Sequence, residues 1–239
     1  MNGEEVWRIW VYLAETPLLG LTITLGAYLI GQGIYRRARL HPAANPVLIA
    51  VLILVGLLSL TDTPYATYFQ GAQFVHFLLG PATVALAIPL YRVLREVRRT
   101  ALGLSAAILA GSLTAAVSAV AIAWIAGASR ETMLSLAPKS VTTPIAMGVS
   151  EAIGGLPSLT AVLVILTGIL GAMAATVTLN LLGIRDWRVR GTAIGVASHG
   201  IGTARALSVN PVAGAFAGLA MGLNGLATAI LLPLLFAWF

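Results

Sequence analysis

Long uncharged stretches alternate along this chain with short segments that carry most of its charges. Four stretches contain no Asp, Glu, Lys or Arg: 63–91, 100–129, 152–184 and 206–239. Each exceeds the roughly 20 residues that a helix needs to cross the hydrocarbon core of a bilayer. Shorter apolar stretches lie at 9–34, which contains Glu15, and at 43–61. The pattern predicts an all-α polytopic integral membrane protein.

Composition strengthens this prediction. Of the 239 residues, 59% are hydrophobic and 9% are charged, against roughly 25% charged in soluble domains. A soluble chain of this length could not bury six apolar helices. The chain has no cysteine, which excludes disulfides and thiolate metal sites. Its start, MNGEEVWRIW, lacks the basic region and cleavage site of a secretory signal, so the first apolar stretch is expected to remain as a span.

The basic residues predict an orientation in the membrane. Ten of the fourteen fall in three clusters, at 36–39, 92–99 and 185–190, and short loops rich in Arg and Lys face the cytoplasm. The acids Asp62 and Glu131 lie in the opposite connections. We therefore expect a multi-pass protein of the cell inner or plasma membrane, with the amino terminus outside. The net charge of +6 then reflects membrane topology and not a nucleic-acid surface.

The third basic cluster would face the wrong side if 132–156 crossed the membrane completely. A re-entrant hairpin that enters and leaves from outside removes the conflict, and the prolines and glycines of this segment are helix breakers. The glycine-rich segment 191–211 is similar and would enter from inside. We therefore predict about six transmembrane helices plus two re-entrant hairpins; the alternative is eight full spans.

This arrangement makes one transmembrane domain over 1–239. It consists of four spans in 9–129, an outer hairpin plus span in 132–182, and an inner hairpin plus span in 191–238. The last two parts form an inverted repeat, an organisation that secondary transporters use to place substrate near the bilayer midplane between broken helices.

Lys139 is the only lysine and lies between two uncharged stretches. An ionisable residue at membrane depth is a functional-site hypothesis by default. Pro138 before it suits the first turn of a helix, whose free N–H groups attract anions. With the hydroxyls of Ser140, Thr142 and Thr143, it would form a pocket for a carboxylate. The alternative is that Lys139 reaches the outer surface or pairs with Glu131 or Glu151.

Arg205, in SHGIGTARAL (198–207), offers a second cation in a segment rich in glycine and hydroxyl groups. It could hold a carboxylate with two hydrogen bonds, or it could serve topology near the inner surface. His199 could relay protons or be a satisfied core residue. Glu151 is the acid expected at depth and a second candidate for proton coupling. For Asn224, among small residues, an interhelical hydrogen bond is expected.

Enzyme motifs do not occur in the sequence. It has no His-Glu-x-x-His metal pattern, no Walker glycine loop and no Gly-x-Ser-x-Gly nucleophile elbow. We therefore expect a protein that is not an enzyme and has no metal, cofactor or catalytic residues.

Four segments resemble the LrgB/CidB family: FLLGPATVALAIPLY (77–91), 136–172, RGTAIGVASHGIGTARAL (190–207) and GAFAGLAMGLNG (214–225). The resemblance runs from about His41 to the end. The family includes antiholin-like modulators of murein hydrolases, pyruvate-uptake components and half of the plastidial glycolate/glycerate translocator. It usually has an acidic stretch after GTARAL, where this chain reads SVNPVAGAF (208–216).

The resemblance implies a set of site residues that match the family pattern: Lys139, Ser140, Thr142, Thr143, Ser198, His199, Gly200, Thr203, Arg205 and Asn224. It implies a transporter of small monocarboxylates such as pyruvate, glycolate, glycerate or acetate. The alternative is an antiholin-like regulator of murein hydrolase export and cell lysis that acts with an LrgA/CidA-type holin-like protein. The expected partners are the carboxylate, that membrane protein and the lipid bilayer; the bundle would also accommodate a homodimer.

Overall fold

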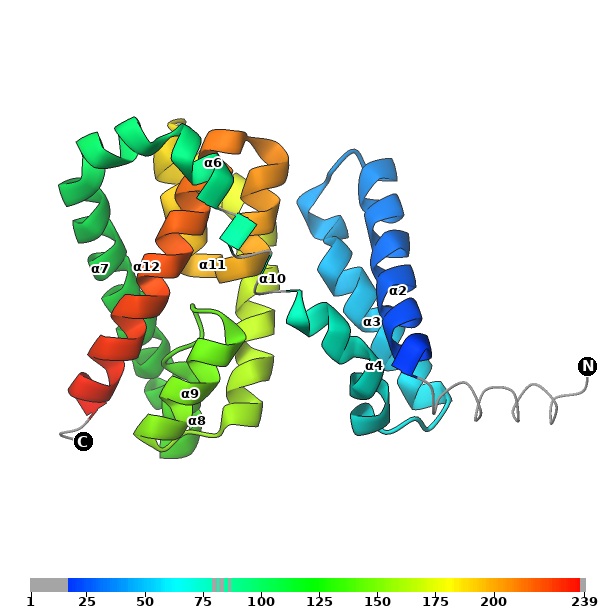
Figure 1. Cartoon of the computed structure of the whole chain (residues 1–239). Helices are drawn as coiled ribbons and strands as arrows, with labels where there is room; N and C mark the ends of the chain where they lie inside the picture. Colours follow the sequence, from blue (N-terminus) through cyan, green and yellow to red (C-terminus); the bar gives the residue numbers. More distant parts are fainter. Residues whose placement is uncertain (1–16, 79–80, 82–83, 86, 237–239) are drawn as a thin grey trace, which may run out of the picture. The chain divides into compact units, whose positions relative to one another are not determined.

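The computed structural model describes residues 17–78, 81, 84–85 and 87–236. All regular elements among these residues are helices (Figure 1), which confirms the all-α prediction. The chain divides into two compact units, Met1–Ala85 and Leu86–Phe239.

The described part of the first unit contains three α-helices and a short 3-10 helix: α2 (Pro17–Arg37), η1 (Pro42–Ala44), α3 (Pro46–Leu60) and α4 (Tyr65–Phe77). Close packing at glycines holds them together, because a side chain at Gly20 would meet the backbone of α4 and one at Gly31 would meet Pro46. A hydrogen bond of 2.8 Å joins the hydroxyls of Thr24 and Tyr68.

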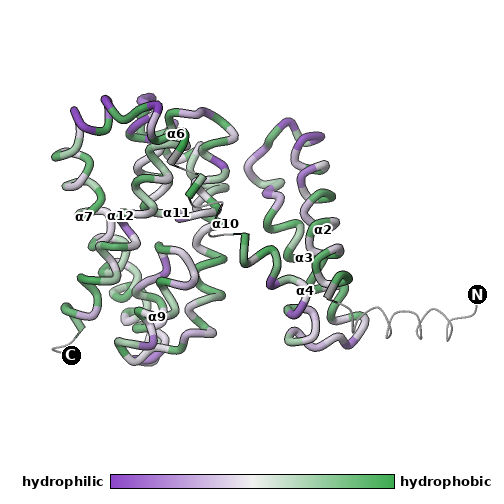
Figure 2. The backbone as a smooth tube through the Cα atoms, in the orientation of Figure 1, coloured by the Kyte–Doolittle hydropathy of each residue, from purple (hydrophilic) through white to green (hydrophobic). Residues whose placement is uncertain are grey.

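The second unit contains α6 (Ala87–Arg92), α7 (Leu94–Ile125), α8 (Arg130–Leu136), α9 (Thr143–Ile153), α10 (Pro157–Leu181), α11 (Trp187–Val209) and α12 (Pro211–Phe236). The three long helices α7, α10 and α12 have apolar sequences, and Figure 2 shows polar residues gathered near the start of α7. Packing of α7, α11 and α12 buries the cluster of Leu104, Ile108, Val196, Phe216 and Ala220.

Two helices begin with the same device. Asn45 and Asn210 each precede a proline, and each side-chain oxygen accepts hydrogen bonds from the two backbone N–H groups that follow the proline. An N-cap satisfies donors that the helix itself cannot, and proline suits the next position because its missing N–H is not needed there. The Asn-Pro pairs therefore explain why α3 and α12 start where they do.

Helices α8 and α9 form a reversal of the chain. They contain 7 and 11 residues, too few to cross a bilayer. The end of α9 returns to α8, because a side chain at Gly155 would lie 2.8 Å from the backbone nitrogen of Ser135. Gly154 ends α9 with a φ of 88°, a left-handed conformation that glycine adopts without strain.

Helix α11 also reverses, although its sequence has no proline. Its backbone is non-helical at His199, with φ 40° and ψ −132°. Before this break it runs parallel to α12, because Gly191 faces Ala213 and Gly195 faces Ala217. After the break it returns, since Leu207 lies against Gly214 in the first turn of α12. The bend in the α11 ribbon is visible in Figure 1.

Within the described part of the chain, four helices are long and apolar enough to span a membrane: 18–37, 94–125, 157–181 and 211–236. The shorter apolar helix α3 covers most of the predicted span 43–61. The predicted span 63–91 is not one helix among the described residues, because α4 ends at Phe77 and α6 begins at Ala87. Pro81, within this stretch, lacks the N–H that a continuous helix needs. Residues 9–16 of the first predicted span lie outside the described residues.

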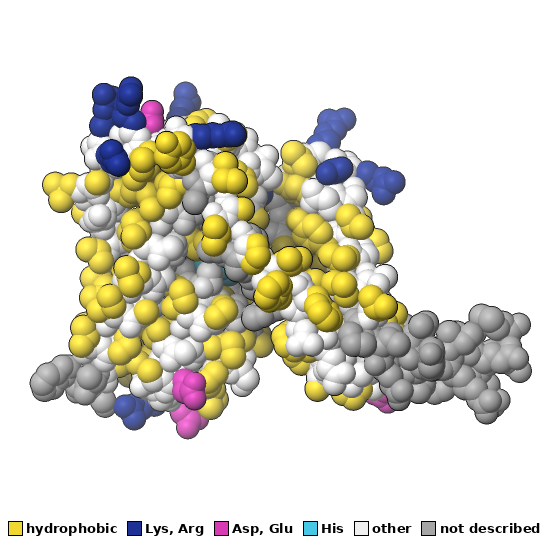
Figure 3. Space-filling model, viewed as in Figure 1, with side chains coloured by type: hydrophobic (Ala, Val, Ile, Leu, Met, Phe, Trp, Pro, Cys, Tyr) yellow, Lys and Arg dark blue, Asp and Glu magenta, His cyan; other side chains and the backbone are white. Residues whose placement is uncertain are grey.

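On the face of the second unit seen in Figure 3, the charged side chains lie mostly towards its two ends. Arg99 and Arg188 line one groove, so the second and third basic clusters share one end. Arg130 follows the other end of α7, which has 32 residues and is about 48 Å long at 1.5 Å per residue. The second and third basic clusters thus lie at the opposite end of α7 from Arg130. Which end faces the cytoplasm stays a prediction.

Candidate functional site

The six-residue connection between α8 and α9 carries Lys139. Lys139 is partly buried, and its ammonium group donates a hydrogen bond of 3.2 Å to the hydroxyl of Ser140. It makes no ion pair with Glu131 or Glu151, both of which are exposed. The N-cap of α9, Thr142, makes no side-chain capping hydrogen bond. The helix predicted to begin at Pro138 instead begins at Thr143, four residues after Lys139.

The break in α11 packs against glycines of α10. A side chain at Gly168 would lie 2.6 Å from the imidazole of His199, and one at Gly171 would overlap the hydroxyl of Ser198. His199 is 5% exposed, and its Nε2 lies 2.9 Å from the carbonyl oxygen of Val164. A carbonyl can only accept, so Nε2 carries the proton of this bond.

Asn224 on α12 connects the two reversals. Its Nδ2 donates hydrogen bonds of 3.2 Å to the carbonyl oxygens of Ser140, in the α8–α9 connection, and Val196, three residues before the break in α11. Asn224 is 1% exposed, and its Oδ1 has no hydrogen-bond partner among the described residues. The interhelical hydrogen bond expected for Asn224 is thus present, and one buried acceptor of the same side chain is left over.

Three other predicted residues lie near the break in α11. Thr203 is buried and donates a hydrogen bond of 2.8 Å to the carbonyl oxygen of His199, while Ser198 is buried and Gly200 is partly buried. Thr143 begins α9 and is partly buried.

The contacts of Asn224 with Ser140 and Val196 are called the junction below. Arg205 lies further along the chain, outside these contacts. It is partly buried on the second half of α11, next to Ala206, which packs with Ala213 near the start of α12. Ala213 and Asn224 are 11 residues apart on one helix, which corresponds to about 16 Å. The backbone of Arg205 is therefore nearer the first turn of α12 than to Asn224.

The two residues suggested for proton coupling are in different environments. Glu151 is exposed near the end of α9, whereas His199 is buried between α10 and α11. The hydrogen bonds of His199 do not reach Glu151. The structure does not bring these two residues into one hydrogen-bonded pair.

Sequence reasoning missed several residues that hold the junction in place. Gly168 and Gly171 make room for the break, and the buried hydroxyls of Ser135, Ser150 and Thr160 tie α8, α9 and α10 together. Thr160 donates to the carbonyl oxygen of Ser135 at 2.9 Å and contacts the Ser150 hydroxyl at 2.7 Å. The i, i+3 spacing of Gly168 and Gly171 is the one signal that could have indicated a close helix contact.

The described hollows, of about 680, 410 and 890 Å³, are not lined by Lys139, His199 or Asn224. Among the described residues, no group of three or more His, Asp or Glu side chains is arranged to hold a metal ion.

Comparison with known proteins gives the family. Residues 24–238 match the LrgB-like family. The Bacillus subtilis protein YwbG is 36% identical over 92% of this chain and 98% of its own length. The antiholin-like protein LrgB of Bacillus mycoides is 28% identical over 92% of this chain and 95% of its own. The holin-like protein CidB of Staphylococcus epidermidis is 29% identical over 95% of this chain and 98% of its own. No solved structure matches the chain. This multi-pass membrane protein therefore belongs to the LrgB-like family.

Proposed function

We propose that this protein is an antiholin-like membrane regulator without enzymatic activity, which acts with a small holin-like membrane protein. The observation that carries this proposal is the extent of its similarity to two named relatives. The antiholin-like LrgB and the holin-like CidB both align with more than nine-tenths of the chain. The proposed target of this regulation is murein hydrolase export and cell lysis.

A second candidate function, a carrier of small monocarboxylates, has separate support. Asn224 joins the two chain reversals beside Lys139. A lysine at membrane depth is costly to retain without a role, and the uncapped start of α9 adds partial positive charge. The buried, unpartnered Oδ1 of Asn224 would accept a hydrogen bond from a ligand. Together these groups suit a small anion that also carries a donor.

The carrier hypothesis includes the inverted repeat. In this proposal, α8–α9 with α10 and the two halves of α11 with α12 are equivalent hairpin-plus-span units of opposite orientation. The reversals at 137–142 and at His199 support this organisation. Transport would open the junction to each side in turn, and separation of the two reversals would break a hydrogen bond that Asn224 donates.

One pair of assays distinguishes the two functions. The purified full-length protein is reconstituted in liposomes, with and without an LrgA/CidA-type protein, and uptake of labelled pyruvate and glycolate is measured. In parallel, cells that express the same variants are tested for murein hydrolase release. A carrier takes up carboxylate in liposomes, whereas a pure regulator changes hydrolase release without uptake.

Lys139→Ala is the informative variant, and Arg37→Ala is its matched control. Arg37 is an exposed cation in the last turn of α2. Loss of one charge-assisted hydrogen bond weakens binding roughly 10- to 100-fold, so the carrier hypothesis requires uptake to fall by this amount in Lys139→Ala only. If wild-type protein shows no uptake with either substrate, the carrier hypothesis is wrong. If hydrolase release does not respond to the protein, the regulator hypothesis is wrong.

A further inference from the structure

A groove of about 890 Å³ lies between α7 and α11 in the second unit. The polarity of its lining changes along its length. Arg99, Asp186 and Arg188 lie at one end, whereas the rest is lined mainly by small and apolar residues. A site of this kind suits a ligand with a charged head and an apolar body.

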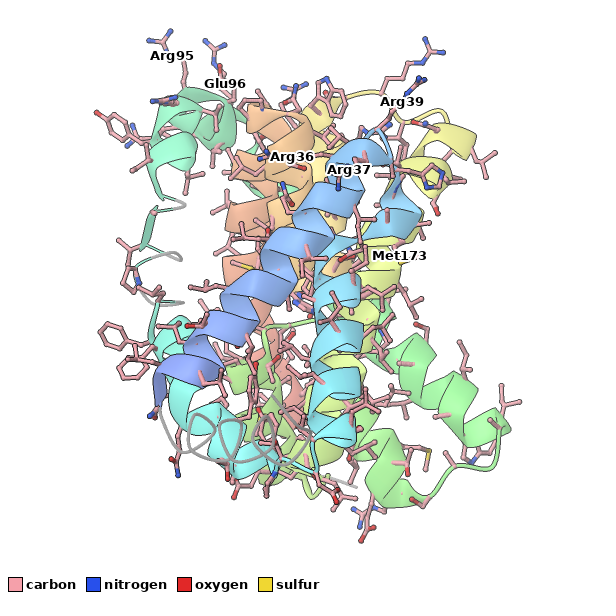
Figure 4. All side chains as sticks on the ribbon, turned by 90° about the vertical axis from the view of Figure 1, so that its right-hand side faces the viewer. Arg36, Arg37, Arg39, Arg95, Glu96 and Met173 are labelled. Carbon is pink, nitrogen blue, oxygen red and sulfur yellow. The ribbon has the colours of Figure 1, made fainter. Side chains whose placement is uncertain are left out.

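The charged end of the groove is basic. Asp186 accepts hydrogen bonds from Arg188 and neutralises it. Arg99 makes no ion pair with any described residue. It also lines an adjacent hollow of about 680 Å³ together with Arg92, Arg95 and Arg98, which are likewise free of ion pairs with the described residues. Glu96 is the acid among them, and Figure 4 shows Arg95 and Glu96 pointing away from the helices.

The apolar part of the groove follows one face of α7. Gly103, Ala107, Gly111 and Ala115 are spaced four residues apart and line it, so they lie on one face of the helix. A side chain at Gly103 would meet no atom within 4 Å, which shows open space above it. At Gly111 the two helices are in close contact and form the bottom of the groove, because a side chain there would lie 3.0 Å from Val196 of α11.

The length of the groove decides between two kinds of occupant. From Arg99 to Ala115 it extends over 16 residues of α7, or about 24 Å. Half of a bilayer with its headgroups measures roughly 20–22 Å, so the groove matches one leaflet. A transmembrane helix would need contact across a hydrocarbon core of roughly 30 Å, but the groove ends at Ala115 while α7 continues to Ile125.

We propose that this groove binds one anionic phospholipid, with its phosphate held by Arg99 and an acyl chain lying along α7 and α11. Basic pockets between membrane helices are suited to acidic lipid headgroups. The lipid would contact Val196, whose carbonyl oxygen accepts the hydrogen bond from Asn224. Lipid occupancy would thus support the half of α11 that leads to the break at His199.

Native mass spectrometry of the delipidated full-length protein tests this proposal. Phosphatidylglycerol and phosphatidylcholine with identical acyl chains are titrated separately. We expect one phosphatidylglycerol molecule to bind each chain at least tenfold more tightly than phosphatidylcholine. Arg99→Gln should remove about a tenfold part of this preference, because a charge-assisted hydrogen bond is lost. Arg37→Gln, which removes an equal charge from α2, should not change it.

A second pair of variants tests the apolar part. Ala107→Leu fills the groove, whereas Ala106→Leu adds the same volume to an exposed neighbour outside it. We expect only Ala107→Leu to weaken phosphatidylglycerol binding, with unchanged helix content in both proteins. Equal binding of the two lipids, or equal effects of the two leucines, would overturn the proposal. Competition by free glycerol phosphate at similar concentration would also overturn it, because the tail would then contribute nothing. A photo-crosslinker at position 107 that captures a polypeptide instead of lipid would do the same.

Discussion

The two chain reversals of the second unit are built in different ways. Between α8 and α9, six residues separate two short helices, and Pro138 and Pro144 stand beside the break. In α11, a single residue with positive φ, His199, breaks an otherwise helical segment that has no proline. The first break follows from local sequence, since proline cannot donate to a helix. The second depends on neighbouring helices, because α10 makes room for it with Gly168 and Gly171.

The comparison teaches that an unusual backbone conformation can be held by side chains elsewhere in the chain. Residues of this kind persist where the surrounding structure determines them. His199 is held by the carbonyl oxygen of Val164, and Val196 before it by the amide of Asn224. The α8–α9 connection shares the Asn224 contact through Ser140 but has its own helix breakers.

Asn224→Leu should have the largest effect, because it removes the contact that the two reversals share. The buried carbonyl oxygens of Ser140 and Val196 both lose a donor, and we expect the free energy of unfolding to fall by about 2–4 kcal/mol. Unfolding in mixed detergent micelles measures it. Thr228→Val, one turn further along α12, removes a single hydroxyl contact with Ser112 and should cost about 1 kcal/mol. Equal losses in the two variants would show that Asn224 has no special role.

Gly168→Ala should distinguish the contribution of the α11 break from that of the α8–α9 connection, because the added methyl group contacts only the α11 break. The added methyl group would lie 2.6 Å from the imidazole of His199, and overpacking of this kind costs typically about 1–3 kcal/mol. Gly148→Ala in α9 is the matched control, since a side chain there would meet no atom within 4 Å. We expect it to stabilise the protein by up to about 1 kcal/mol. Thermal unfolding should therefore shift in opposite directions, and a shared direction would contradict the packing argument.

Two substitutions of His199 test whether its positive φ carries backbone strain, which the α8–α9 connection lacks at Ala137. His199→Gly and His199→Ala both remove the hydrogen bond to Val164, but only glycine adopts positive φ without strain. The glycine variant should therefore be more stable than the alanine variant by about 1 kcal/mol, as measured by the same unfolding titration. At Ala137, which precedes the other break with an ordinary helical φ of −51°, glycine should instead be less stable than the native alanine. If alanine equals or exceeds glycine at position 199, backbone strain does not hold the second break.

Asp186 precedes α11 and lies outside both breaks, so its substitution serves as a reference. We expect Asp186→Asn to have the smallest effect on stability. Hydrogen bonds from Arg188 lower its pKa to about 2, below the usual value of roughly 3.9. A lowered pKa in the folded state stabilises the protein above the unfolded value, and this contribution is lost as the pH falls from about 4 towards 2. Asp186→Asn should therefore reduce the dependence of the unfolding midpoint on pH in this window.

Much of the candidate site could be predicted from sequence because its residues are polar in an apolar chain. Lys139, Ser140, His199 and Asn224 stand out for this reason, and two hydrogen bonds of Asn224 connect the two reversals. The positions of Arg205 and Glu151 could not be predicted in the same way. A polar residue in a broken segment can face the junction or solvent, and only the path of the backbone decides between them.

The sequence by itself determined the membrane class, the all-helical fold, the family and the first break, because hydropathy, proline and capping residues act over one or two helical turns. Only the tertiary structure decided that α11 turns back at His199, that the predicted span 63–91 is not one helix among the described residues, and that one asparagine joins both reversals. The physical reason is the distance along the sequence over which the deciding interactions act. A helix break without proline costs free energy locally, and it forms where distant glycines leave space and a distant amide satisfies the carbonyl groups beside it.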